Sequence, residues 1–245
     1  DTDGILKVMR SYQYYAASRI TGRVAMRRWA DKDQYGGYIW HTTGSGKTLT
    51  SFKSAQLIAG SRDADKVVFL MDRVELGTQS LMDYRGFADD AGSVQDTEDT
   101  NVLVAKLKSN DPANMLIVTS IQKMSRIEEN SSYNAHDIEL IRDKRIVFII
   151  DEAHRSIYKK YQEIFDYFDA YILGMTATPK DDVGKNTYRV FDLENGNPTY
   201  DYELEQAVKE KYLVSYSTLE YKTKIMEDGI QYNELSEEEK ESFEE

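Results

Sequence analysis

The sequence predicts an α/β fold in three layers, with a central, mainly parallel β-sheet between two layers of helices. Five apolar runs rich in β-branched residues predict strands buried on both faces, at 38–40, 67–71, 115–120, 146–150 and 171–175. Stretches with helical periodicity lie between several of them, at 49–59, 74–87 and 158–168. Strands and helices that alternate in this way are typical of a sheet with helices on both sides.

A glycine-rich loop follows the first predicted strand and precedes the first predicted helix. Its glycines would let backbone N–H groups surround phosphate oxygens, and the helix N-terminus favours the same anion. The residues expected to hold a nucleoside triphosphate with Mg²⁺ are Thr43, Gly44, Ser45, Gly46, Lys47 and Thr48. Lys47 would reach the β and γ phosphates and Thr48 would ligate Mg²⁺. The strict pattern G-x-x-x-x-G-K-[ST] requires glycine at position 41, where this chain has His41.

A second motif, Asp-Glu-Ala-His, follows the fourth predicted strand at 151–154. Asp151 is expected to hold Mg²⁺ and Glu152 to polarise the attacking water, because phosphoryl transfer needs both charge neutralisation and an oriented nucleophile. His154 is assigned to coupling rather than to chemistry. A lone Asp-Glu pair at the start of a helix is also a common structural feature, but the phosphate loop favours the catalytic interpretation.

Polar residues also follow the other predicted strands, and the carboxyl ends of parallel strands share one edge of a sheet. Thr176 and Thr178 come at the end of the fifth strand and could report the state of the γ phosphate through hydrogen bonds to the 151–154 turn. A threonine before proline at the exit of a strand is also ordinary loop chemistry. We expect all these residues to lie along the same edge.

The chain is expected to form one α/β domain over residues 1–182, followed by a linker or extension over 183–245. Within the domain, 91–110 is interpreted as a polar insertion with a short helix at 100–107, and 128–137 as a loop. Beyond it, 186–202 is polar with turn signals and 204–212 suggests a helix.

The net charge of −12 is concentrated at the end of the chain, where residues 227–245 contain nine acidic residues and one lysine. Near the start, six basic residues could face phosphates or form a solvated helix face: Lys7, Arg10, Arg19, Arg23, Arg27 and Arg28. There is no cysteine, and the longest apolar run, 146–150, is too short to cross a bilayer. We therefore expect a soluble, cytoplasmic protein with no membrane partner.

These motifs resemble those of the superfamily 2 helicases and translocases over about residues 8–180, which implies a RecA-like P-loop NTPase domain that uses ATP and Mg²⁺. The stretch Arg10-Ser11-Tyr12-Gln13 is similar to the adenine-reading Q motif, so Arg10 and Gln13 are expected near the adenine. Residues 41–48, 151–154 and 176–178 resemble motifs I, II (in its DEAH form) and III. Motif I commonly lacks the first glycine in this superfamily, which accounts for His41.

Within the superfamily, the chain is most similar to the motor (restriction, R) subunit of type I restriction-modification enzymes. The resemblance lies in residues 40–48, 72–79, 119–123, 151–156 and 200–214. It implies an ATP-driven translocase of double-stranded DNA that works with modification and specificity subunits. Candidate contacts to the DNA backbone are Arg73, Gln79, Thr119 and Gln122. Ordinary structural hydrogen bonding would explain these four equally well.

The resemblance also implies a nuclease domain before residue 1 and a second RecA-like domain with an arginine finger after residue 245. The piece is then expected to hydrolyse ATP poorly by itself. Two alternatives stay open, namely another superfamily 2 helicase of repair or type III restriction, and a nucleotide-dependent interaction module without productive hydrolysis.

Overall fold

The computed structural model describes residues 8–29, 36–71, 82, 94–96, 99–129, 133, 135–151, 159–168, 170–177, 181–182, 185–186, 191 and 197–215. The chain divides into two compact units, Asp1–Leu213 and Val214–Glu245. All helices and strands of the described residues belong to the first unit. Within these residues no helix is long and apolar enough to cross a membrane.

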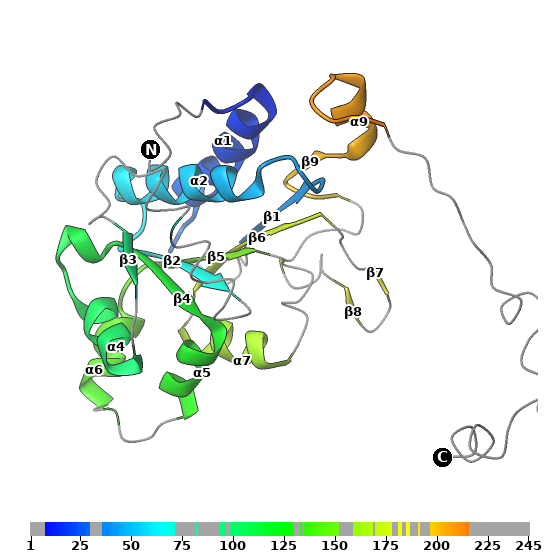
Figure 1. Ribbon diagram of the computed structural model, residues 1–245. Coiled ribbons are helices and arrows are strands. Elements are labelled where there is room, and N and C mark those ends of the chain that lie inside the picture. Colours follow the sequence, from blue (N-terminus) through cyan, green and yellow to red (C-terminus); the bar gives the residue numbers. More distant parts are fainter. Residues whose placement is uncertain are drawn as a thin grey trace, which may run out of the picture. The chain divides into compact units, whose positions relative to one another are not determined.

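A seven-stranded sheet forms the centre of the first unit, in the order β3-β4-β2-β5-β6-β1-β9 (Figure 1). Every pairing in it is parallel, as predicted. Its strands are β1 (Gly36–His41), β2 (Lys66–Met71), β3 (Val94–Asp96), β4 (Leu116–Ser120), β5 (Ile146–Asp151), β6 (Tyr171–Thr176) and β9 (Tyr200–Tyr202). A separate antiparallel pair consists of β7 (Asp181–Asp182) and β8 (Lys185–Asn186).

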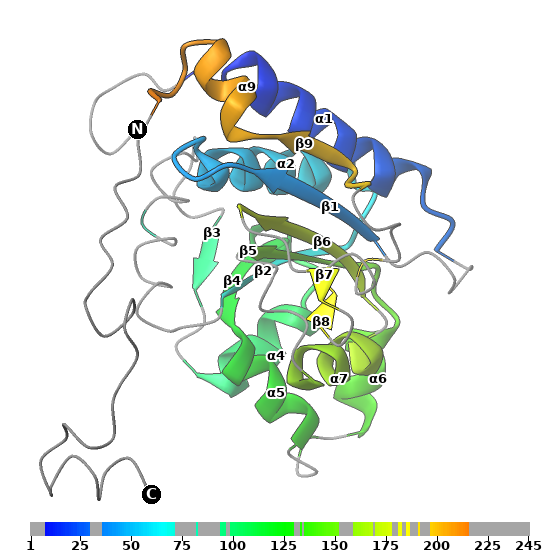
Figure 2. The same ribbon diagram turned by 90° about the vertical axis from the view of Figure 1, so that its right-hand side faces the viewer.

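Helices cover both faces of the sheet (Figure 2). One face packs on α1 (Ser11–Met26) and α2 (Lys47–Ser61), and the other on α4 (Thr100–Lys108), α5 (Ile121–Glu129), α6 (Ala135–Arg142) and α7 (Lys159–Phe168). Successive strand residues alternate between the two cores. Ile39 and Phe69 pack with α1 and α2, whereas their neighbours Tyr38 and Val68 pack on the opposite face. Burial of each such side chain contributes about 1.5–3 kcal/mol to stability. Because each face of the sheet forms its own core with a layer of helices, the three-layer α/β prediction is confirmed.

The long helix α1 precedes the sheet and buries one stripe of its surface. Ala16, Ile20 and Val24 recur every four residues on that stripe and are almost fully buried against α2 and the sheet. The opposite face of α1 is exposed, with Tyr14 and Met26 among its large apolar side chains. The N-terminal end of this buried stripe therefore brings Tyr12 and Gln13 into the interior of the protein.

Two short edge strands and the ends of one predicted loop differ from the sequence prediction. β3 lies inside the segment interpreted as an insertion, and β9 lies inside a stretch interpreted as polar turns. Neither has the apolar run of a central strand, and each pairs with a single neighbouring strand at an edge of the sheet. The predicted loop 128–137 was wrong at its ends, since α5 extends to Glu129 and α6 begins at Ala135. The predicted helix 74–87 lies outside the described residues except at Met82.

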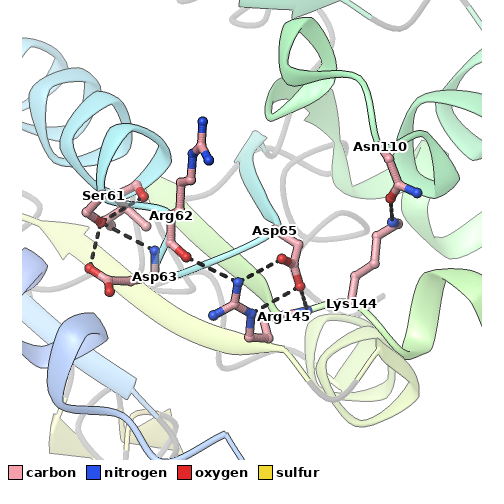
Figure 3. A network of polar contacts seen from close by, with 8 residues as sticks. Ser61, Arg62, Asp63, Asp65, Asn110, Lys144 and Arg145 are labelled. Atoms are coloured by element: carbon pink, nitrogen blue, oxygen red, sulfur yellow. Dashed lines mark hydrogen bonds and ion pairs between the residues drawn. The ribbon is translucent and has the colours of Figure 1, made fainter.

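The amino-terminal edge of the sheet is held together by a polar network that Figure 3 shows. The Arg145 guanidinium donates to both carboxylate oxygens of Asp65, at 2.8 and 3.1 Å, and to the carbonyl of Arg62 at 3.1 Å. These bonds lower the pKa of Asp65. Nearby, Lys66 is 1% exposed and its Nζ donates to the carbonyls of Lys106 and Asn114 at 2.8 and 2.7 Å. Burial lowers the pKa of Lys66 to about 8.

Candidate functional site: the phosphate loop and its supports

The glycine loop connects the end of β1 to the start of α2 at the carboxyl edge of the sheet. Gly44 and Gly46 have φ angles of +80° and +76°, in the left-handed region that side chains disfavour. Gly46 caps α2, whose first helical residue is Lys47. The first N–H groups of this helix have no acceptor within it, so they and the helix dipole face the loop. This geometry fits an anionic group such as a phosphate.

Hydrogen bonds inside the loop fix its shape. The Ser45 hydroxyl donates to the carbonyl of Thr42 at 2.6 Å, and the Ser45 N–H donates to the same oxygen at 3.2 Å. At the other end, the N–H of Thr50 donates to the carbonyl of Gly46 at 3.2 Å and closes the first turn of α2. Thr43 and Gly44 are exposed at the crest of the loop. The loop is thus shaped by the chain itself.

Two side chains of α1 reach the loop from the side. The Tyr12 hydroxyl donates to the carbonyl of Ser45 at 2.9 Å, and Gln13 Nε2 donates to the carbonyls of Ser45 and Gly46 at 3.2 and 3.1 Å. Gln13 Oε1 accepts from the N–H of Arg10 at 2.9 Å, and the Gln13 side chain is nearly buried. The structure therefore brings Gln13 to the loop, while its contact with adenine stays a prediction.

His41 ends β1 directly before the loop and is completely buried. Its ring lies 5.5 Å from that of Tyr12 and 5.9 Å from that of Tyr202, and neither ring nitrogen has a hydrogen-bond partner among the residues that the structure describes. Burial, and then the charge of Lys47, lower the pKa of His41 to about 4. The imidazole is therefore neutral near pH 7. The residue that breaks the strict loop pattern is part of an aromatic core under the loop.

The strand order places the two predicted motifs close together. β6 lies between β1 and β5, with Trp40 opposite Thr176 and Met175 opposite Asp151. Strands are spaced about 4.8 Å apart, so the end of β5 lies roughly 10 Å from the end of β1. Trp40 also donates from its indole N–H to the carbonyl of Ala177 at 3.0 Å. The loop and the exit from β6 are thus directly connected.

Several predicted site residues lie outside the described part of the chain, namely Arg73, Gln79, Glu152, His154 and Thr178. Asp151 is described in its backbone only.

Of the predicted residues that are described near β4 and β6, Thr176 and Thr119 are buried, with 0% and 2% of their surface exposed. Gln122 is exposed on α5. Gln122 is therefore the one of the four proposed DNA contacts for which the described structure offers an exposed side chain.

Sequence reasoning missed the apolar cluster beside the loop, in which the rings of Tyr202 and Tyr212 and the side chain of Leu213 pack around Tyr12. The chain contains 18 tyrosines, and one group of them recurs in the stretch 200–212. That enrichment was the available signal. The enrichment does not show which tyrosines are in contact, because Tyr12 and Tyr202 are far apart along the chain.

A cavity of about 330 Å³ lies away from this site. Its lining comes from the segments before β2, β4 and β5, including Arg62, Lys66, Asp111 and Lys144. These segments belong to the amino-terminal edge of the sheet, opposite the phosphate loop. Lys66 and Lys144 already donate to protein oxygens there. The cavity therefore adds nothing to the nucleotide site.

Comparisons with known proteins agree with this arrangement. The chain matches the SWI2/SNF2 ATPase family over residues 12–245. It is 37% identical over 224 residues to the type I restriction enzyme SsaAORF53P endonuclease subunit of Staphylococcus saprophyticus. The aligned region covers 89% of this chain and 22% of that subunit. The chain thus spans less than a quarter of this relative.

Solved structures show the same fold. The ATP-dependent type ISP restriction-modification enzyme LlaBIII, bound to DNA, is similar with a TM-score of 0.60 at 18% identity, over 86% of this chain and 16% of that one. The helicase domain of Hef from Pyrococcus furiosus gives a TM-score of 0.57 at 18% identity, over 86% and 41%. The fold is that of a RecA-like helicase domain. The chain belongs to the SWI2/SNF2 ATPase family, and its relatives include endonuclease subunits of type I restriction enzymes.

Proposed function

We propose that this chain is the first motor domain of a type I restriction enzyme, in which it binds and hydrolyses ATP to drive translocation along double-stranded DNA. The observation that carries the proposal is the phosphate loop, with two left-handed glycines before α2, at the same sheet edge as the end of β5. The identity to a type I endonuclease subunit supports the choice of a restriction enzyme.

In this proposal the loop residues Thr43–Thr48 hold the phosphates, and Lys47 neutralises the charge of the β and γ phosphates. Thr48 and Asp151 would hold Mg²⁺, which when bound supplies further positive charge at the phosphate oxygens. Glu152 orients the attacking water.

Other residues would recognise the nucleotide and transmit its state. Gln13 lies beside the loop and accepts a hydrogen bond from the N–H of Arg10, and these two residues would contact the adenine. His154, Thr176 and Thr178 would couple the γ phosphate to the rest of the motor. The hydrogen bond from Trp40 to Ala177 supports this role, since it joins the strand that leads into the loop to the segment that contains both threonines.

Double-stranded DNA is the proposed track. A motor that moves along any sequence must grip the backbone, so contacts from Arg73, Gln79, Thr119 and Gln122 would be independent of sequence. Modification and specificity subunits are the proposed protein partners, and the cytoplasm the proposed location. Because the chain spans 22% of its S. saprophyticus relative, DNA cleavage and a second motor domain are assigned to other parts of such a protein.

The test measures ATP turnover by the full-length protein with and without double-stranded DNA, together with displacement of a third strand from a DNA triplex. Lys47→Ala should weaken ATP binding about ten-fold or more, because it removes a charge-assisted contact. Glu152→Gln should retain binding and lower turnover by about 10²–10⁴-fold.

Matched controls come from the same structural elements or their neighbours. Lys53→Ala removes a lysine from α2 whose Nζ donates to Gln56 rather than facing the loop, and Glu163→Gln changes an exposed carboxylate of α7. Both should behave as the parent does. Turnover that ignores DNA and survives Glu152→Gln would refute the motor assignment. Tight ATP binding without turnover in the full-length protein would favour a nucleotide-dependent interaction module instead.

A further inference from the structure

The segment from β9 to Leu213 packs directly on the phosphate loop and on the start of α1. The ring of Tyr202 stacks on that of Tyr12 with centroids 3.9 Å apart and planes 6° apart. The ring of Tyr212 meets Tyr12 edge-on at 5.3 Å, and the Arg10 guanidinium lies 4.7 Å from the centre of the Tyr212 ring. Tyr12 is 3% exposed and is thus enclosed by this segment and the loop.

Backbone contacts connect the same two regions. β9 pairs with β1, and the N–H of Thr42 donates to the carbonyl of Tyr202 at 3.0 Å. Leu213 packs against the cluster of Tyr12, Tyr202 and Ala207. Its Cδ2 lies 3.4 Å from the position that a Cβ atom on Gly44 would occupy, so Leu213 lies close to the crest of the loop. Leu213 is also the last residue of the first compact unit.

Hydrogen bonds also connect the end of the segment 200–213 to its own beginning. The Tyr202 hydroxyl donates to Glu210 at 2.8 Å, just after the short helix α9 (Leu204–Lys209). The N–H groups of Tyr212 and Leu213 both donate to the carbonyl of Ala207, at 2.9 and 3.1 Å. The segment 200–213 is therefore a single hydrogen-bonded element whose inner surface touches the loop.

From these contacts we propose that Tyr12 is a positioning residue that couples the phosphate loop to the segment 200–213. Its hydroxyl holds the Ser45 carbonyl, while its ring stacks on Tyr202. A change in the loop when ATP binds would move the Ser45 carbonyl, which holds the Tyr12 hydroxyl, and Tyr12 would pass that movement to Tyr202 through the ring stack. The segment that contains Tyr202 ends at Leu213, the last residue of the first unit. The inference rests on the proposed function, since it assigns to the same loop a mechanical connection toward the chain beyond residue 213.

Thermodynamic linkage makes the coupling measurable from both ends. If packing of the segment raises the affinity of the loop for nucleotide by a certain factor, bound nucleotide must raise the equilibrium constant for packing of the segment by the same factor. Loss of one hydrogen bond that preorganises the loop corresponds to about a five-fold change. ATP binding should therefore slow local opening of the segment by about that factor.

The experiment uses the full-length protein and a non-hydrolysable ATP analogue with Mg²⁺. Equilibrium titration gives the affinity, and hydrogen exchange with mass spectrometry follows peptides that contain the N–H groups of Tyr212 and Leu213. The variant Tyr12→Phe keeps the ring stack and removes only the hydroxyl. Tyr14→Phe is the matched control, because Tyr14 lies on the same helix and is 62% exposed. Leu213→Ala tests the coupling from the segment's side.

We expect the parent and Tyr14→Phe to show slower exchange at 204–213 when the analogue binds. Tyr12→Phe should bind the analogue about five-fold more weakly and lose most of that protection, with a thermal midpoint close to the parent's. Leu213→Ala should also reduce the protection. A merely structural Tyr12 would change the thermal midpoint without changing the nucleotide-dependent protection, and that result would overturn the coupling. If the parent protein bound no analogue at all, the proposed function would fail and the coupling with it.

Discussion

The buried imidazole of His41 should make the protein lose stability as the pH falls from about 7 to 5. The pKa of His41 is lowered from 6.5 to about 4, mainly by burial in the aromatic core under the loop. The unfolded chain therefore binds a proton at this histidine before the folded chain does. The stability that comes from keeping His41 neutral is therefore fully present above pH 6.5 and is lost as the pH falls through about 4.

The magnitude follows from the two pKa values. Between pH 7.5 and pH 5 the free energy of unfolding should fall by about 2 kcal/mol from His41 alone, by linkage between proton binding and folding. The variant His41→Phe removes the titrating group and keeps an aromatic ring against Tyr12 and Tyr202. Within the described part of the chain it gives up no hydrogen bond, because neither nitrogen of His41 has a partner there.

Urea unfolding at pH 7.5 and at pH 5 measures the effect. The quantity to compare is the difference between the two pH values, because the larger phenylalanine ring also changes absolute stability. This difference should be about 2 kcal/mol smaller in His41→Phe than in the parent. His136→Gln is the control, since the His136 side chain is 69% exposed on α6, and it should retain the parent's difference. The reasoning is refuted if His41→Phe loses as much stability at pH 5 as the parent does.

Three further outcomes are expected. Gly46→Ala should weaken binding of an ATP analogue about ten-fold in an equilibrium titration, because φ is +76° and the new Cβ would meet Gln13 Nε2 at 2.7 Å; an affinity equal to the parent's would contradict the loop geometry. Arg145→Lys should lower the free energy of unfolding in urea by about 0.5–1 kcal/mol, since it loses the two-pronged contact with the half-exposed Asp65; no change would mean that the network does not hold this edge. Lys66 has its pKa lowered to about 8 from 10.5, so stability should rise between pH 8 and 9.5 in the parent and stay flat in Lys66→Met, as followed by thermal unfolding.

The central sheet and the backbone geometry of the glycine loop were predictable because their signals are local. An apolar β-branched run such as 146–150 must be buried wherever it lies, and it forms β5 as expected. Glycines before a lysine and a helix specify a left-handed turn, which Gly44 and Gly46 adopt. In both cases the residues that carry the signal are neighbours along the chain.

The edges of the sheet were not predictable in the same way. β9 has one buried residue out of three, so its sequence does not differ from that of a loop until β1 supplies the hydrogen-bond partners. The role of Tyr12 likewise depends on Tyr202, which is far away in the chain. No local pattern records such a pair, because the side chain's partner is chosen by the topology.

The sequence by itself determined that this chain forms a parallel α/β domain with a glycine loop between β1 and α2, because burial and backbone freedom act over a few consecutive residues. The tertiary structure alone decided that Tyr12 and Gln13 donate hydrogen bonds to the loop, that His41 is buried with no hydrogen-bond partner among the described residues, and that Leu213 lies close to Gly44. These features arise only after the fold has brought β1, β9 and α1 together, since the residues involved are distant along the chain.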